Sequence, residues 1–215
     1  MKKFIAIFIS LYFQYCLPTE VGEKIQLPEP EIVGGVTLNE ALNNRKTSRD
    51  FDGTKKIDFQ KLSQALWSCY GVNRPNGYRT TPSATAWFPL IVYAFLEDGV
   101  YKYEPKENML TKVLDGDQRS YTGSQKAIVN NASVNFIILG DFNKKSSMDG
   151  DDEHKIRSLY LDTGHCTMGL SLFASSQNMK GVVREMVEAD SLLELLGLKK
   201  EDYLFSLAYL RYYIN

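Results

Sequence analysis

The sequence predicts an α+β fold in which helices flank a central mixed or antiparallel β-sheet. Two uninterrupted apolar runs, 90–96 and 134–140, are typical of buried strands. Apolar residues recur at helical spacing elsewhere, over the longest stretch at 153–177. Asp98-Gly99 is a hairpin turn, and the apolar and aromatic residues after it continue as the returning strand at 100–105. Strands separated by helices, with one hairpin among them, indicate the α+β class.

The length and composition fit one globular domain. The chain has 215 residues, of which 44% are hydrophobic and 24% charged, so it can bury a substantial core. Its formal net charge of -1 argues against nucleic acid as a partner. The cysteines fall into no metal-binding spacing, and we expect Cys69 and Cys166 to be small buried hydrophobic residues.

The N-terminus has the layout of a secretory signal. Two lysines follow Met1, and an apolar run covers 4–13, which is too short to span a bilayer. We therefore interpret 1–18 as a signal peptide and expect an exported protein, periplasmic or secreted. Lipid attachment at Cys16 is an alternative, although bulky Tyr15 stands where a small residue usually precedes a lipidated cysteine.

The rest of the chain divides into an arm and a folded domain. Residues 19–36 are polar and broken by prolines and a Gly-Gly pair, which predicts a linker or N-terminal arm. Residues 37–215 form the domain, in which no stretch reaches transmembrane length.

Helix caps and apolar spacing predict the other elements of the domain. Gly164 and Gly169 would let a neighbour approach the long helix closely. In chain order we expect a helix capped by Thr37, a helix from the cap Asp58 to Gly71, a mixed stretch at 111–129 that is mostly helical after 122 or 123, a strand with an irregular end at 180–187, a short helix at 191–196 and a final strand at 204–214.

Metal and hydrolase sites are poorly supported. His154 lies in an acidic loop that fits no calcium-binding pattern, and Asp162 with His165 has no further histidine to complete a zinc site. Cys166 follows His165 directly, and adjacent helical residues do not face each other. Ser83 lacks a nucleophile elbow. We therefore predict no metal and no catalytic side chain.

Two short segments could together bind a nucleotide-like ligand. In extended chain, Arg45, Thr47 and Arg49 would point to one side and place two guanidinium groups and a hydroxyl around an anion. The alternative is a solvated basic turn. Small residues at Pro82-Ser83-Ala84 would let the backbone approach the edge of a flat ring. A phosphate at one end and a planar heterocycle at the other describe flavin mononucleotide (FMN).

The same segments carry a resemblance to the nitroreductase-like FMN flavoproteins. The stretch 45–51 resembles their R-x-S/T-x-R-x-F opening. Four further segments are similar to the thiazoline-oxidase (SagB-like) branch and keep its order. These are R-T-x-P-S-A with its closing proline at 79–89, G-x-Y-x-Y-x-P at 99–105, D-x-G-H at 162–165 and L-L-G-L at 195–198. Together the matches span roughly residues 40–212.

The resemblance implies a homodimer with two FMN sites, each built from both subunits. Arg45, Thr47 and Arg49 would hold the phosphate and ribityl end, and 82–84 would line the ring from the partner subunit. Such proteins pass hydride through flavin N5 between NAD(P)H or another donor and a small-molecule acceptor.

Two positions depart from the family pattern. Glu185-Met186 stands where the family usually has a Gly-Gly pair beside N5, and the backbone N–H of Met186 would still reach N5. Near the C-terminus, Arg211 would serve the phosphate in place of the family's glycine-containing strand end. An alternative function is a non-catalytic flavin-binding or interaction protein of the same fold.

Overall fold

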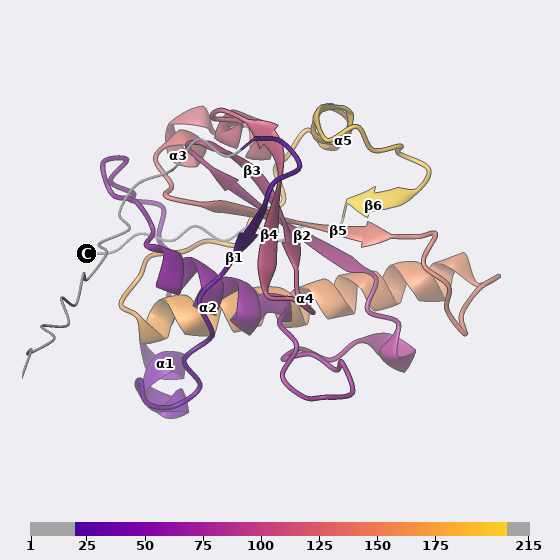
Figure 1. Ribbon diagram of the computed structural model, residues 1–215, viewed down its shortest axis with the longest axis horizontal. Coiled ribbons are helices and arrows are strands. Elements are labelled where there is room, and N and C mark those ends of the chain that lie inside the picture. The colour runs from indigo at the N-terminus through magenta and orange to yellow at the C-terminus, as the bar shows by residue number, and fades with distance from the viewer. Residues whose placement is uncertain (1–19, 206–215) are drawn as a thin grey trace, which may run out of the picture.

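The computed structural model describes residues 20–205 (Figure 1), with only the backbone given at Phe205. The predicted signal peptide at 1–18, Cys16, Arg211 and most of the predicted strand at 204–214 lie outside the described residues. Between residues 20 and 205, no helix combines the length and apolar character needed to cross a bilayer.

A six-stranded antiparallel sheet forms the centre of the protein, in the order β1-β4-β3-β2-β5-β6 (Figure 1). This confirms the α+β prediction with the antiparallel form of the sheet. The strands are β1 (Lys24–Gln26), β2 (Leu90–Leu96), β3 (Gly99–Glu104), β4 (Met109–Asp115), β5 (Asn135–Asp141) and β6 (Tyr203–Phe205).

Helices cover both faces of the sheet. On β2, Val92 and Ala94 pack toward α2 (Phe59–Tyr70) and α4 (Asp152–Ser176), whereas Tyr93 and Phe95 pack on the opposite face. That opposite face is covered by the short helices α3 (Lys126–Asn130) and α5 (Ala189–Leu195). Because both faces are buried, β2 and β5 read as continuous apolar runs rather than as alternating ones.

Side-chain caps fix the starts of the first two helices, as predicted. Thr37 Oγ1 accepts a hydrogen bond from the Glu40 N–H at 3.2 Å at the start of α1 (Leu38–Asn44). The Asp58 carboxylate accepts from the Lys61 N–H at 2.7 Å at the start of α2. Each cap is worth about 1 kcal/mol.

One of the two glycines predicted to permit close packing on α4 does so. A Cβ placed on Gly169 would lie 2.3 Å from the Ser68 carbonyl oxygen of α2, so the two helix backbones touch there. Gly164 has no atom within 4 Å of the corresponding position. Cys69 of α2 and Cys166 of α4 are buried free thiols, in agreement with the prediction for both.

The secondary structure differs from expectation at three places. Residues 109–115 form β4, a strand that was not expected at the start of the mixed stretch, whereas α3 agrees with the helix expected after 122 or 123. The N-terminal arm contributes β1, which pairs with β4. Residues 180–187 form no strand, apart from an isolated parallel bridge between Gly181 and Thr47. Cross-strand pairing explains both strands, because β4 pairs with β3 on one side and with the edge strand β1 on the other, and strand formation depends on such partners more than on local propensity.

Candidate functional site

The predicted anion clamp lies in exposed, extended chain just after α1. Thr47 forms a parallel bridge with Gly181, and the Ser48 N–H donates to the Gly181 carbonyl at 3.0 Å. Arg45, Thr47 and Arg49 are all exposed. In the described part of the chain, neither guanidinium group forms an ion pair. Extended backbone at Thr47 supports the predicted period-2 arrangement, and both cations remain available to a ligand.

Buried packing holds the end of the clamp segment in place. Phe51 and Val182 are buried against each other, and Ile128 packs on the pair. Lys180 Nζ lies 3.1 Å from the Asp50 carboxylate and ties the same two segments together at the surface. The clamp segment is therefore packed against the segment that continues toward Met186.

Met186 lies on that same segment, close to the loop before α3. Its carbonyl accepts a hydrogen bond from the Ser124 N–H at 3.2 Å, and its side chain is 60% exposed. A Cβ on Gly123 would lie 3.1 Å from Arg184 Nη2 and 3.3 Å from the Met186 carbonyl oxygen, so this crossing is tight. The Met186 N–H donates no hydrogen bond within residues 20–205. The structure thus brings the clamp and Met186 onto adjacent segments of one protomer.

A buried carboxylate holds the Pro82-Ser83-Ala84 loop. Asp162 of α4 is only 3% exposed. It accepts hydrogen bonds from Ser83 Oγ at 2.5 Å and from the Ala84 N–H at 3.2 Å, and Ser83 Oγ itself accepts from the Phe88 N–H at 2.8 Å. Burial raises the pKa of Asp162, against the lowering effect of these two donors. Asp162 thus positions the Pro82 loop, a role that the D-x-G-H motif in the sequence does not reveal.

The loop after Ala84 has an unusual backbone. Thr85, Ala86 and Phe88 have φ values of 51°, 56° and 50°, in the left-handed region. A β-branched residue with positive φ is a marked outlier, and such strain persists where surrounding contacts fix the chain. The hydrogen bonds around Ser83 supply those contacts.

Within one protomer the clamp and the Pro82 loop are far apart. Ser175 Oγ donates to the Ala41 carbonyl of α1 at 2.6 Å, which places α1 and the following clamp near the C-terminal end of α4. Asp162 holds the Pro82 loop thirteen residues earlier, or roughly 20 Å along the helix at 1.5 Å per residue. Figure 1 shows the chain after α1 at the left and the loops between α2 and β2 at the lower right.

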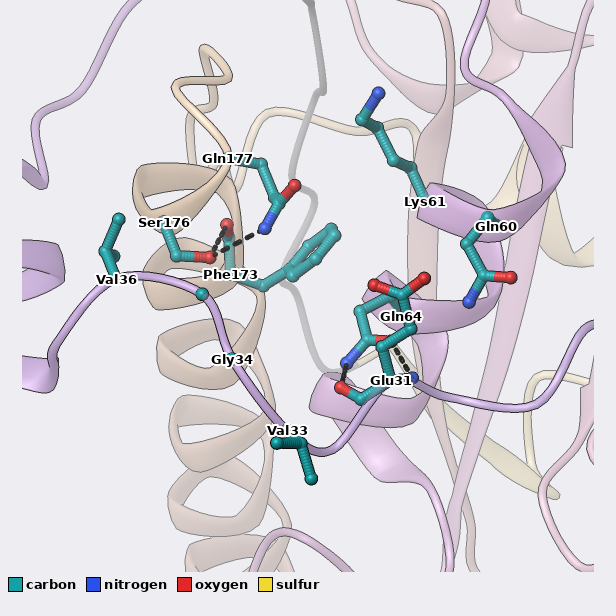
Figure 2. Close-up of a pocket in the computed structure, with 11 residues that line it drawn as sticks. Glu31, Val33, Gly34, Val36, Gln60, Lys61, Gln64, Phe173, Ser176 and Gln177 are labelled. Carbon is teal, nitrogen blue, oxygen red and sulfur yellow. Dashed lines mark hydrogen bonds between the residues drawn. The ribbon is translucent and has the colours of Figure 1, made fainter.

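Two pockets lie near these helices. One, of about 320 Å³, is bounded by 74–88 and includes Pro82 and Ser83 in its wall. The other, of about 160 Å³, lies between the arm and helices α2 and α4. Figure 2 shows this second pocket, where Glu31 and Gln64 exchange hydrogen bonds of 2.7 and 2.9 Å that attach the arm to α2. Its polar groups therefore serve to dock the arm, whereas the first pocket adjoins a predicted site segment.

The chain is similar to known proteins over most of its length. A model of the nitroreductase family matches residues 42–209. A candidate nitroreductase of Methanocaldococcus jannaschii is 26% identical over 186 residues, 82% of this chain and 91% of its own. The crystal structure of a candidate nitroreductase from Ralstonia eutropha has a TM-score of 0.81 at 27% identity, covering 94% of this chain and 95% of its own.

A more distant structure shows the fold with a ligand. A candidate nitroreductase from Desulfovibrio desulfuricans, solved in complex with FMN, has a TM-score of 0.59 at 14% identity. The match covers 83% of this chain and 86% of that one. The family model does not separate branches, so the closer likeness to thiazoline oxidases stays a prediction.

Proposed function

The chain belongs to the nitroreductase family, and we propose that it is an FMN-dependent oxidoreductase. The observation that carries the proposal is the Arg45/Thr47/Arg49 clamp, which is exposed, extended and free of internal ion pairs in the described structure. It lies beside the segment that bears the Met186 N–H. Phosphate and flavin N5 would thus be served by neighbouring segments of one protomer.

The residues present fit FMN in their chemistry. Two guanidinium groups and a hydroxyl match the donor pattern that phosphate oxygens require. The Pro82-Ser83-Ala84 backbone is held in place by Asp162 and carries only small side chains, as close approach to a ring edge needs. Glu185 and Met186 are both exposed, so replacement of the family's small pair leaves the protein interior unchanged.

Bound FMN would supply the two-electron carrier, with NAD(P)H or another reductant as donor and a small molecule as acceptor. The protein's own groups would hold the phosphate at the clamp and present the Met186 N–H. They would also fix the Pro82 loop through Asp162.

We further propose that two copies of the chain form each site. The clamp and the Pro82 loop lie roughly 20 Å apart along α4, so loops from two protomers would have to close around one cofactor. The outer side of α4 and the adjoining α1 expose several large apolar side chains that a second copy would cover. These are Leu38, Leu42, Tyr160, Leu161 and Met168, with Leu161 67% exposed.

The self-association proposal is tested by Leu161→Asp, with Val21→Asp as the control, because Val21 is an exposed apolar residue before β1 and outside the proposed face. Sedimentation velocity should show a dimer for the parent protein and the control, and a monomer for Leu161→Asp. A parent protein that sediments as a monomer with FMN bound would contradict the shared site.

Export remains a proposal that rests on the basic and apolar N-terminus at 1–18. NAD(P)H is scarce outside the cytoplasm, so an exported enzyme would draw electrons from another donor. N-terminal sequencing of the mature protein tests this, with a start near Thr19 expected and an intact Met1 as the contradicting result.

The FMN proposal is tested by the visible spectrum of the purified protein. A flavin spectrum that bleaches anaerobically with NADH, NADPH or dithionite is expected. A yellow protein that no reductant bleaches would favour the non-catalytic alternative. A colourless protein that FMN cannot reconstitute would refute both readings.

Arg49→Ala tests the clamp, with Lys46→Ala as the matched control. Lys46 is an exposed neighbour one position out of phase with the clamp residues. A hydrogen bond to a charged group is worth about 1.5–3 kcal/mol, so FMN affinity should fall roughly 10- to 100-fold in Arg49→Ala. Lys46→Ala should retain FMN. An equal loss of FMN affinity in both variants would show that Arg49 contributes only general surface charge and does not form a specific clamp.

A further inference from the structure

The pocket bounded by 74–88 holds a buried cation that the FMN proposal does not use. Arg79 is 8% exposed, and its guanidinium lies 4.0 Å above the Tyr70 ring centroid and 5.4 Å from that of Phe88. Arg79 Nη1 donates to the Tyr70 carbonyl at 3.0 Å, whereas Nε is buried without a hydrogen-bond partner. No carboxylate of the described residues pairs with it. A buried charge without a counter-charge is costly, so an anion in the pocket would be stabilised.

Further cations surround the same pocket. Arg74 is held in place by donating from Nη2 to the Arg79 carbonyl at 3.1 Å and from Nε to Asn73 Oδ1 at 2.9 Å. Lys144 Nζ donates to the Phe88 carbonyl at 2.7 Å. Burial lowers the pKa of Lys144, and the positive charge of Arg79 lowers it further because the two cations repel each other.

The carboxylate attached to the pocket wall is already engaged. Asp162 accepts hydrogen bonds from Ser83 and Ala84 and does not pair with either arginine. The local charge of the pocket is therefore positive, in a protein whose net charge is -1. An anion would meet two forked guanidinium groups at one site.

The pocket also offers aromatic walls. The rings of Tyr78 and Phe88 lie 5.7 Å apart between centroids, at an angle of 55°. Tyr78 is partly exposed, and the Arg74 guanidinium lies 5.5 Å from its ring centroid. Rings at such positions accept a flat ligand by offset or edge contacts.

We propose that this pocket is an anion subsite that selects a flat, ring-bearing ligand carrying a carboxylate or phosphate group. Because Pro82 and Ser83 line it, the ligand would lie beside the flavin ring, and that placement rests on the proposed function. The proposed subsite therefore implies that the electron donor or acceptor is a planar molecule with an anionic group. Arg74 and Arg79 bind the anion, and Tyr78 with Phe88 contacts the ring.

Isothermal titration with benzoate, phenyl phosphate and neutral benzyl alcohol tests the proposal. At low ionic strength, at least one of the two anions should bind ten or more times as tightly as benzyl alcohol. Preference for benzoate would identify a carboxylate ligand, and preference for phenyl phosphate would identify a phosphate such as that of a nicotinamide nucleotide. Equal binding of all three probes, or no binding, would overturn the subsite.

Arg74→Gln should weaken binding of the preferred anion about fivefold or more and leave benzyl alcohol unaffected. Lys24→Gln, on edge strand β1, removes the same charge outside the pocket and should change neither. Since Arg79 is buried, Arg79→Lys serves as a second variant that keeps the charge and removes the fork, and it too should weaken anion binding. An unchanged anion affinity in Arg74→Gln would overturn the assignment.

This test separates the subsite from the FMN proposal. The pocket is built from one continuous segment, so the titrations apply to FMN-free and FMN-containing protein alike. A colourless protein that FMN cannot reconstitute, and that still prefers the anion, would refute FMN binding and retain the subsite. A flavin-containing protein without anion preference would refute the subsite and retain the FMN proposal.

Discussion

The contact between Gly169 and α2 gives a sharp test of how the two long helices pack. In Gly169→Ala, the new Cβ would lie 2.3 Å from the Ser68 carbonyl oxygen and would have to move to an ordinary separation of about 3.5 Å. Overpacking of this kind costs about 1–3 kcal/mol. Alanine also gains about 0.8–1.0 kcal/mol over glycine in helix propensity, which offsets part of the cost.

Gly164→Ala is the matched control, because it lies on the same helix with no atom within 4 Å of the added Cβ. Both variants share the propensity gain, so the difference between them isolates the overpacking cost of about 1–3 kcal/mol. Urea unfolding followed by far-UV circular dichroism should show Gly164→Ala above the parent and Gly169→Ala below Gly164→Ala. All proteins should be compared at one low concentration, because Gly164 lies on the proposed dimer face. Equal stability of the two variants would refute close packing at Gly169.

Three further predictions concern the Pro82 loop. Ser83→Ala removes a donor to the buried carboxylate of Asp162 and the acceptor for the Phe88 N–H, so the free energy of unfolding should fall by about 1–3 kcal/mol; an unchanged urea midpoint would contradict this. Burial raises the folded-state pKa of Asp162, so its protonated form is favoured by folding, and its contribution to stability declines as pH rises through the range just above the ordinary carboxylate pKa. Asp162→Asn should flatten that part of the pH–stability curve, and an identical curve would exclude Asp162 as its source. Thr85→Gly removes a β-branched residue from a left-handed backbone conformation and should stabilise the fold by about 1 kcal/mol. Calorimetry should show a thermal midpoint a few degrees higher than that of the parent protein. A lower midpoint would show that the Thr85 side chain stabilises the loop.

The helix starts and the central strand could be predicted because residues close in sequence determine them. Thr37 and Asp58 cap helices because each side-chain oxygen satisfies a backbone N–H that the helix leaves free. The bounds of β2 agreed with its apolar run because both faces of that strand are buried. The sequence allowed an extended backbone around Thr47, and the bridge to Gly181 agrees with it, but the binding of an anion by Arg45, Thr47 and Arg49 stays a prediction.

Long-range contacts decided what the sequence could not show. In β4, Lys112 is almost fully buried and carries a 2.6 Å ion pair with Asp115, so the strand lacks an apolar alternation. A strand was expected at 180–187, yet Val182 is buried against Phe51 instead of pairing along a sheet. The contact between Asp162 and Ser83 joins positions 79 residues apart, and only the folded chain brings them together.

The distance along α4 between the clamp and the Pro82 loop has a thermodynamic consequence. If neither half-site alone encloses the cofactor, FMN binding and association of the two chains are linked equilibria, and each strengthens the other by the same factor. Apparent FMN affinity would then fall on dilution, and added FMN would lower the concentration at which the protein pairs. A destabilising change on the outer face of α4 would therefore release FMN without touching any residue that binds it.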